Sequence, residues 1–129
     1  DRFFTYTLHR WQALNEENFK RFLAVESLSQ RVAMLERILC GHIISFAKGM
    51  EHRLESRFDL SITDFRRSQV QSFEGIKVRT FDMQFKTNVL LPPYIALGKG
   101  VSVGFGEVVR VNDRPDSNHN NPQQVWARR

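Results

Sequence analysis

The chain has 129 residues, 41% of them hydrophobic, which is enough to bury the core of one compact domain. Its formal net charge of +5 favours a polyanionic partner such as RNA or DNA, and its most apolar stretch, residues 38–47, is too short to span a bilayer. Cys40 is the only cysteine, which excludes an internal disulfide and a cysteine metal cluster and fits a protein of the reducing cytoplasm.

The first half of the chain predicts one strand and two helices. Apolar and polar side chains alternate over residues 3–11, as in a half-buried strand. Asn15 is a favourable N-cap for a short helix that ends near Val25, and Ser27 begins a capping box for a longer helix that ends near Gly49. The apolar stripe of the longer helix consists of Val32, Leu35, Leu39, Ile43 and Phe46.

The next part of the chain predicts a hairpin. Residues 57–65 alternate again, and a third strand begins at Ile76, so that the polar, turn-like residues 66–75 would join the two strands. The apolar positions change parity within the third strand, from Ile76 and Val78 to Phe81 and the apolar residues after it. A bulge near Thr80 would account for this change.

A last strand and a polar tail follow. The third strand ends before Pro92-Pro93, and residues 94–97 allow at most one turn of helix. Apolar residues of one parity then predict the last strand, and these are Val101, Val103, Phe105, Val109 and Val111. Residues 112–129 are too polar to fold alone, so we expect a disordered tail.

The most specific stretch is residues 97–107, where four of the seven glycines fall within nine residues. Glycine-rich backbone can direct its N–H groups at a phosphate, and Lys99 and Ser102 add a charge and a hydroxyl. The spacing G-x-G-x-x-x-G-x-G departs from the Walker and dinucleotide-binding patterns, so a nucleotide-dependent enzyme is not expected. A tight turn into an edge strand, with no ligand, explains the glycines equally well.

The predicted hairpin concentrates basic residues, and two histidines could carry a proton. The basic residues are Arg66, Arg67, Lys77, Arg79 and Lys86. Binding to nucleic acid and a strand edge kept soluble by charge are equally consistent with them. His9 on the first strand and His42 beside the helical stripe are weak candidates for a general base, because packed or surface histidines are commoner.

The order of the elements predicts an α+β domain. Strand, long helix, hairpin, short turn and strand is the order of a ferredoxin-like βαββαβ unit with a reduced second helix. We therefore expect residues 1–111 to form a sandwich with a four-stranded antiparallel sheet, similar to RNA-recognition modules. The same layout serves many small-molecule domains, so the fold alone does not select a function.

Residues 90–106, with the sequence LLPPYIALGKGVSVGFG, resemble the C-terminal glycine-rich signature of the CRISPR-associated endoribonucleases that process repeat RNA. Further blocks of similarity lie at residues 11–18, 38–49 and 85–88. The resemblance implies two tandem ferredoxin-like domains, of which this chain would be the second, following an N-terminal domain absent from the sequence. It also implies metal-independent cleavage of repeat RNA into guide RNAs, in which the ribose 2′-hydroxyl attacks the adjacent phosphate and leaves a cyclic phosphate.

The resemblance also assigns a site. In the family, the glycine-rich loop and the neighbouring basic hairpin bind the repeat RNA, and a histidine of the N-terminal domain is usually the general base. Lys99 and backbone amides would hold phosphates, Phe105 would pack beneath the loop, and no metal or cofactor would be needed. The implied RNA-binding residues are Gly98, Lys99, Gly100, Ser102, Gly104, Phe105 and Gly106, with Arg66, Arg67, Lys77 and Arg79 of the hairpin.

Two other functions remain open at this point. The chain could be a non-catalytic RNA-binding subunit of the same defence system, or a ferredoxin-like regulatory domain that binds a phosphorylated ligand or a protein. The hairpin edge or the face around Trp11 could also serve a homodimer. A catalytic histidine in a preceding domain, and binding to RNA rather than to small ligands, would separate these functions.

Overall fold

The structure is a computed structural model that describes residues 2–52, 54, 58–73 and 75–111. The predicted tail, residues 112–129, therefore lies outside the described residues. The elements are β1 (Phe4–Trp11), α1 (Glu16–Ala24), α2 (Leu28–Gly49), β2 (Leu60–Phe73), β3 (Ile76–Thr87), β4 (Ile95–Ala96) and β5 (Glu107–Arg110), with a short 3₁₀ turn at Val101–Val103. Within these residues, no helix is both long and apolar enough to cross a membrane.

Both helices begin at the predicted caps. The Asn15 side chain accepts the N–H of Asn18 at 2.7 Å, and the Ser27 hydroxyl accepts the N–H of Gln30 at 3.4 Å. Along α2 the residues that become fully buried are Leu35, Leu39, Ile43 and Ala47. The helical stripe of the sequence thus becomes the face that packs on the sheet.

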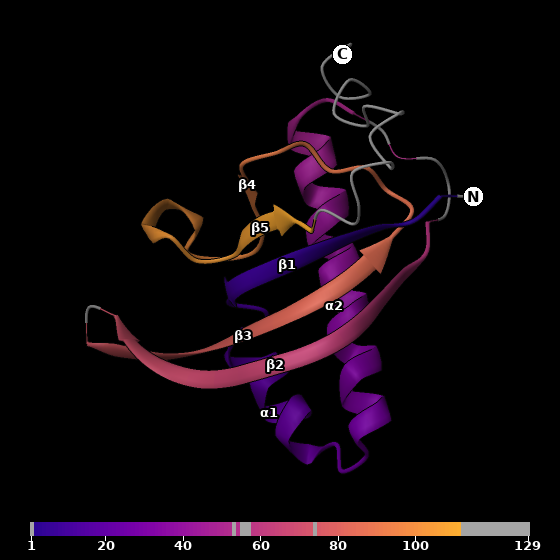
Figure 1. The fold of residues 1–129 in the computed structure, drawn as a ribbon. Coiled ribbons are helices and arrows are strands. Elements are labelled where there is room, and N and C mark those ends of the chain that lie inside the picture. Colours follow the sequence, from indigo (N-terminus) through magenta and orange to yellow (C-terminus); the bar gives the residue numbers. More distant parts are fainter. Residues whose placement is uncertain (1, 53, 55–57, 74, 112–129) are drawn as a thin grey trace.

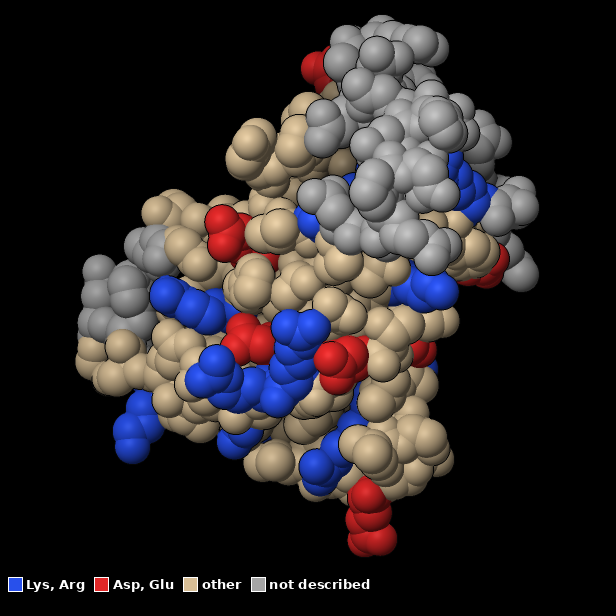
Figure 2. Space-filling view, viewed as in Figure 1, with Lys and Arg blue, Asp and Glu red and all other residues tan. Residues whose placement is uncertain are grey.

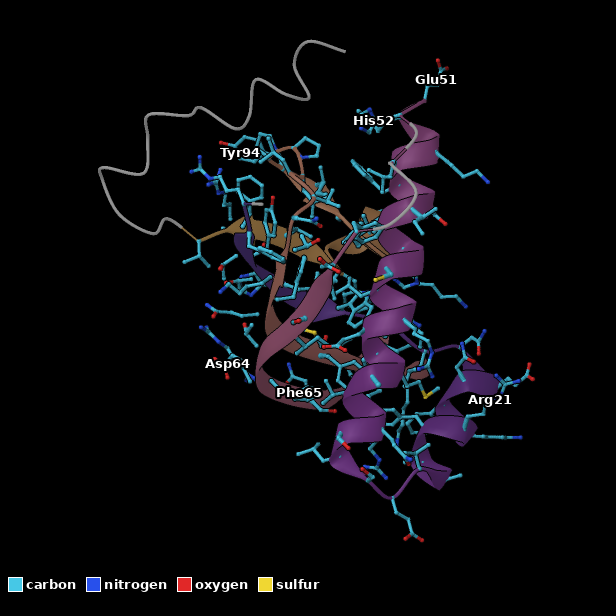
Figure 3. All side chains as sticks on the ribbon, turned by 90° about the vertical axis from the view of Figure 1, so that its right-hand side faces the viewer. Arg21, Glu51, His52, Asp64, Phe65 and Tyr94 are labelled. Carbon is cyan, nitrogen blue, oxygen red and sulfur yellow. The ribbon has the colours of Figure 1, made fainter. Side chains whose placement is uncertain are left out.

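Over the part of the chain that the structure describes, the sheet has five strands in the order β2-β3-β1-β5-β4, and each neighbouring pair is antiparallel (Figure 1). Both helices cover one face, toward which Phe65 points, whereas Asp64 points to the open face (Figure 3). The expectation of four strands is wrong because the chain after Pro92-Pro93 extends instead of forming a helical turn. Ile95 pairs with Val108 there, directly after Tyr94, whose φ is +62°.

The hairpin is longer than expected. Residues 66–73 do not form a turn but continue β2, paired with β3 up to Phe73 opposite Ile76. The expected bulge near Thr80 is also wrong, because the register irregularities lie in β2, between Ile62 and Asp64 and between Phe65 and Arg67, and in β1, between Leu8 and Trp11. Polar residues are typical of turns, so the polar residues of this paired strand were assigned to a turn.

The parity of β3 and of the last strand, β5, also differs from expectation. Arg79 lies on the helix side of β3, with its guanidinium 5.3 Å from the Phe19 ring centre, so Val78 faces the other way. The last strand starts only at Glu107, and Val108 is buried while Val109 is 45% exposed. The glycines before it take positive φ, which interrupts the extended chain and shifts the alternation.

The core lies between the helices and β1 and β3, around Trp11, Tyr6 and Phe81, each at most 1% exposed. The Tyr6 hydroxyl donates to the Val89 carbonyl at 3.3 Å and accepts the Leu91 N–H at 2.8 Å. These two bonds satisfy buried backbone groups in the segment between β3 and β4, and so fix the start of β4 against β1.

Candidate nucleic-acid interface

The glycine-rich loop, residues 97–106, joins β4 to β5. Its glycines Gly98, Gly100, Gly104 and Gly106 all have positive φ, at +87°, +75°, +96° and +79°. A Cβ on Gly106 would overlap the Leu97 carbonyl oxygen, and one on Gly100 would lie 2.6 Å from the Phe105 ring. At Gly104, in contrast, the nearest atom would be Nη2 of Arg10, at 3.9 Å. Close packing thus requires the glycines at 100 and 106, whereas at 104 only the backbone conformation does.

The loop is docked on the end of β1 by its own amides. The Gly106 N–H donates to the carbonyls of both His9 and Arg10 at 2.9 Å. The Phe105 N–H donates to the Gly100 carbonyl at 3.1 Å, and the Gly104 N–H donates to that of Val101 at 3.2 Å. The amides of residues 104–106 therefore serve the fold, and any phosphate contact must come from earlier in the loop, where Lys99 and Ser102 are exposed.

Phe105 packs beneath the loop, as the resemblance implied. Its side chain is 3% exposed, with Gly100 against its ring. The guanidinium of Arg10 lies 4.8 Å from the ring centre, which is the geometry of a cation–π contact. The ring is therefore covered by the protein and is not open to a base.

Arg10 is the residue that the sequence did not reveal. It sits in the bulge of β1, with φ of +50°, and its main-chain N–H donates to Oδ1 of Asp82 on β3 at 2.7 Å. The other carboxylate oxygen of Asp82 pairs with the Arg67 guanidinium at 3.3 Å. The only available signal was the spacing of Leu8 and Trp11, both apolar but three residues apart, which breaks the alternation of a strand.

The hairpin arginines do not form one patch. Arg66 and Arg67 lie on the open side, paired with Asp64 at 3.0 Å and with Asp82 at 3.3 Å. Arg79 instead turns toward α1, and its Nη1 donates to Ser68 at 2.8 Å. Figure 2 shows this open face, where lysines and arginines lie beside acidic side chains. Both guanidiniums are exposed and keep N–H donors beyond the one that meets the carboxylate, so Arg66 and Arg67 can bind a phosphate beside their acidic partners.

The loop and the far end of the hairpin lie at the same end of the sheet. In Figure 1 the far end of the β2–β3 hairpin and the 3₁₀ turn of the loop project from the same end, the one at which β1 finishes. The Asp82 carboxylate connects β1 with β2, through Arg10 and Arg67. Lys77 is exposed near the hairpin end, opposite Ser72. The structure thus brings the loop, Arg10 and Arg67 together and directs Arg79 elsewhere.

The two histidines have different surroundings. The Trp11 indole N–H donates to Nδ1 of the half-buried His42 at 3.0 Å, so His42 is a packed, hydrogen-bonded residue, which is the commoner role of a histidine in such a position. His9 is half-buried on β1, and its backbone lies opposite that of Glu107 in the antiparallel pairing of β1 with β5. Among the described residues, no group of three histidine, cysteine or acidic side chains is placed to hold a metal ion.

Burial lowers the pKa of His42 below its ordinary value of 6.5. The folded state then binds fewer protons than the unfolded state, so the stability due to neutral His42 is present above about pH 6.5 and is lost as the pH falls through the lowered pKa. We expect the melting temperature to fall from about pH 7.5 to about pH 5, and to fall less for His42→Asn, whose amide oxygen can still accept the Trp11 N–H. Equal falls in both proteins would contradict this role of His42.

A family model, the Cas6b C-terminal domain, matches residues 1–111. The chain belongs to this family. An uncharacterized protein of Methanocaldococcus jannaschii, MJ0978, is 31% identical over 103 residues, which are 80% of this chain and 69% of that protein. The resemblance to CRISPR-associated endoribonucleases is therefore confirmed at the level of the family.

Solved structures agree with this assignment. A crystal structure of the CRISPR RNA processing endoribonuclease Cas6b matches with a TM-score of 0.78 and 28% identity, over 86% of this chain and 56% of that one. A second Cas6b crystal structure gives the same values. Csf5, a type IV Cas6 crRNA endonuclease, matches in fold with a TM-score of 0.68 at 13% identity. The chain thus spans little more than half the length of the solved Cas6b proteins.

Proposed function

We propose that this chain is the RNA-holding C-terminal domain of an endoribonuclease that binds and cleaves CRISPR repeat RNA. The observation that carries the proposal is the match of residues 1–111 to the Cas6b C-terminal domain. It is supported by the exposure of Lys99 and Ser102 in the glycine-rich loop and of Arg67 on β2, which Asp82 links to the end of β1. Lys99 and Arg67 would contact phosphates, and the glycines would hold the loop in place on β1.

RNA binding at the end of the sheet fits better than stacking on its open face. RNA-recognition modules stack bases on aromatic residues of the two central strands. Here the open-face residues of β1 and β3 pair as Thr5 with Lys86 and Thr7 with Gln84, and none of these is aromatic. The ferredoxin-like assignment belongs to the proposal, supported by the order β2-β3-β1-β5 of the four longer strands. The short β4 is then an addition at the edge.

The chemistry that we propose is metal-independent attack of the ribose 2′-hydroxyl on the adjacent phosphate, with the general base supplied by a preceding domain. His42 is a poor base from its position, because Trp11 holds its Nδ1 and burial lowers its pKa. The unsuitability of His42 as a base would also fit a second candidate function, a non-catalytic RNA-binding subunit of the same system. A histidine in the preceding domain whose substitution abolishes cleavage would decide between the two.

RNA binding by the chain itself tests the proposal. The probes are the repeat RNA of the host's own CRISPR array, an RNA of the same composition in scrambled order, and a panel of nucleotides. We expect tighter binding to the repeat than to the scrambled RNA, with affinity that falls as salt rises. A rise in melting temperature with nucleotides and none with RNA would favour the regulatory-domain alternative instead.

A further inference from the structure

The backbone of Arg10 is held in a strained conformation by its neighbours. Its φ of +50° is in the left-handed region, where an arginine is disfavoured and a glycine is not. The surroundings impose this conformation from both sides, because the Arg10 N–H donates to Asp82 and its carbonyl accepts the Gly106 N–H. The backbone geometry alone would favour glycine, so the presence of arginine has to be explained by its side chain.

The Arg10 side chain is exposed and oriented. Its guanidinium lies over the buried ring of Phe105, and the open space at Gly104 lies next to Nη2, 3.9 Å from the position of a Cβ there. Stacking on a ring covers one face of a guanidinium and leaves the N–H groups at its edge available as donors. Among the described residues the Arg10 guanidinium forms no ion pair. The nearby carboxylate of Asp82 accepts the Arg10 main-chain N–H with one oxygen and pairs with the Arg67 guanidinium through the other.

Asp82 therefore positions two cations without neutralising Arg10. The Asp82 side chain is 15% exposed, whereas that of Arg67 is 65% exposed. Its carboxylate, on β3, fixes the bulge of β1 from which Arg10 projects and holds the Arg67 guanidinium on the other neighbouring strand, β2. Two guanidiniums that lie near the end of β1, between the hairpin and the loop, can bind phosphates of one RNA strand.

We propose that Arg10 binds an RNA phosphate at this junction and that Asp82 is the positioning residue for Arg10 and Arg67. This inference rests on the proposed function, since it adds a residue to the same RNA site. Arg10 then donates hydrogen bonds to a phosphate. The amides of residues 104–106 cannot do so, because they donate to carbonyls of the protein itself.

The strained backbone gives a sharp test. Arg10→Gly removes the guanidinium and suits the left-handed backbone, so we expect an unchanged or higher melting temperature. We expect its affinity for the host's repeat RNA to fall about tenfold at about 100 mM salt, and the slope of log K against log salt to fall by about 0.7. Arg10→Lys keeps the charge and should recover part of the affinity. Arg21→Ala, which removes an exposed arginine from α1, is the control and should leave both quantities unchanged.

The outcomes separate the inference from the proposed function. If the wild-type chain binds the repeat RNA and Arg10→Gly binds it equally well with the same salt slope, Arg10 only packs on Phe105 and the inference is overturned. If the wild-type chain does not bind the RNA, the proposed function fails and this inference fails with it. Asp82→Ala gives a second measurement, in which we expect a larger loss of affinity than for Arg67→Ala alone. An equal loss would contradict the positioning role of Asp82.

Discussion

Gly106→Ala should destabilise the domain more than any other single glycine substitution in the loop. A Cβ at this position would overlap the Leu97 carbonyl oxygen, and the φ of +79° is unfavourable for alanine. The left-handed backbone costs about 1–2 kcal/mol, and forcing aside the backbone at Leu97, directly after β4, adds about 1–3 kcal/mol. We therefore expect the free energy of unfolding, measured by urea denaturation, to fall by roughly 3 kcal/mol.

Gly104→Ala is the matched control for this prediction. Gly104 has a similar φ of +96°, but a Cβ there would meet nothing closer than 3.9 Å. Only the conformational cost of about 1–2 kcal/mol should then appear. Equal losses of stability in the two variants would mean that the backbone at Leu97 makes room for a Cβ at little cost, and that the close approach of Gly106 to Leu97 is not required.

The largest expected effect on RNA binding belongs to the hairpin. The double variant Arg66→Ala/Arg67→Ala removes two exposed guanidiniums, whose partners Asp64 and Asp82 remain. We expect the affinity for the repeat RNA to fall more than tenfold, and the salt slope to decrease by between about one and two, because two phosphate contacts are lost. The melting temperature should change little, since exposed ion pairs contribute only about 0–1 kcal/mol each.

The control for the hairpin variant carries the same change in charge. Arg21→Ala/Arg37→Ala also removes two exposed arginines, but from α1 and α2. If the site lies at the end of the sheet, this variant should bind nearly as well as the wild type. Similar losses in both double variants would show that affinity follows the net charge alone, and the assignment of Arg66 and Arg67 would be wrong.

Local signals predicted the helices well and the strands less well. The caps at Asn15 and Ser27 and the stripe of α2 follow from side chains within one or two turns, so sequence spacing was sufficient. The extension of β2 to Phe73 could not be found in this way, because its residues are polar and only pairing with β3 keeps them extended. The last strand was predicted to start too early, because the alternation of apolar residues was followed across Gly104 and Gly106, whose positive φ interrupts the extended chain.

The candidate site was predicted in part. The loop from Gly98 to Gly106 was recognised from its glycines, but the sequence could not show that its later amides bond to His9 and Arg10. Arg10 was missed because its contacts, Asp82 and Phe105, lie far along the chain and the bulge hides it within an apparently regular strand. The assignment of Gly98, Lys99, Gly100, Ser102, Gly104, Gly106, Lys77 and Arg79 to RNA binding stays a prediction.

The most direct test of the account is cleavage of the host's own repeat RNA in EDTA, comparing this 129-residue chain with the full-length gene product and measuring binding by both. The account predicts that both proteins bind the RNA and that only the full-length protein cuts it, leaving a cyclic phosphate. Cleavage by this chain alone would contradict the proposed division of labour and make His9 or His42 the leading candidate for the base. Failure of both proteins to bind the repeat would contradict the RNA site itself.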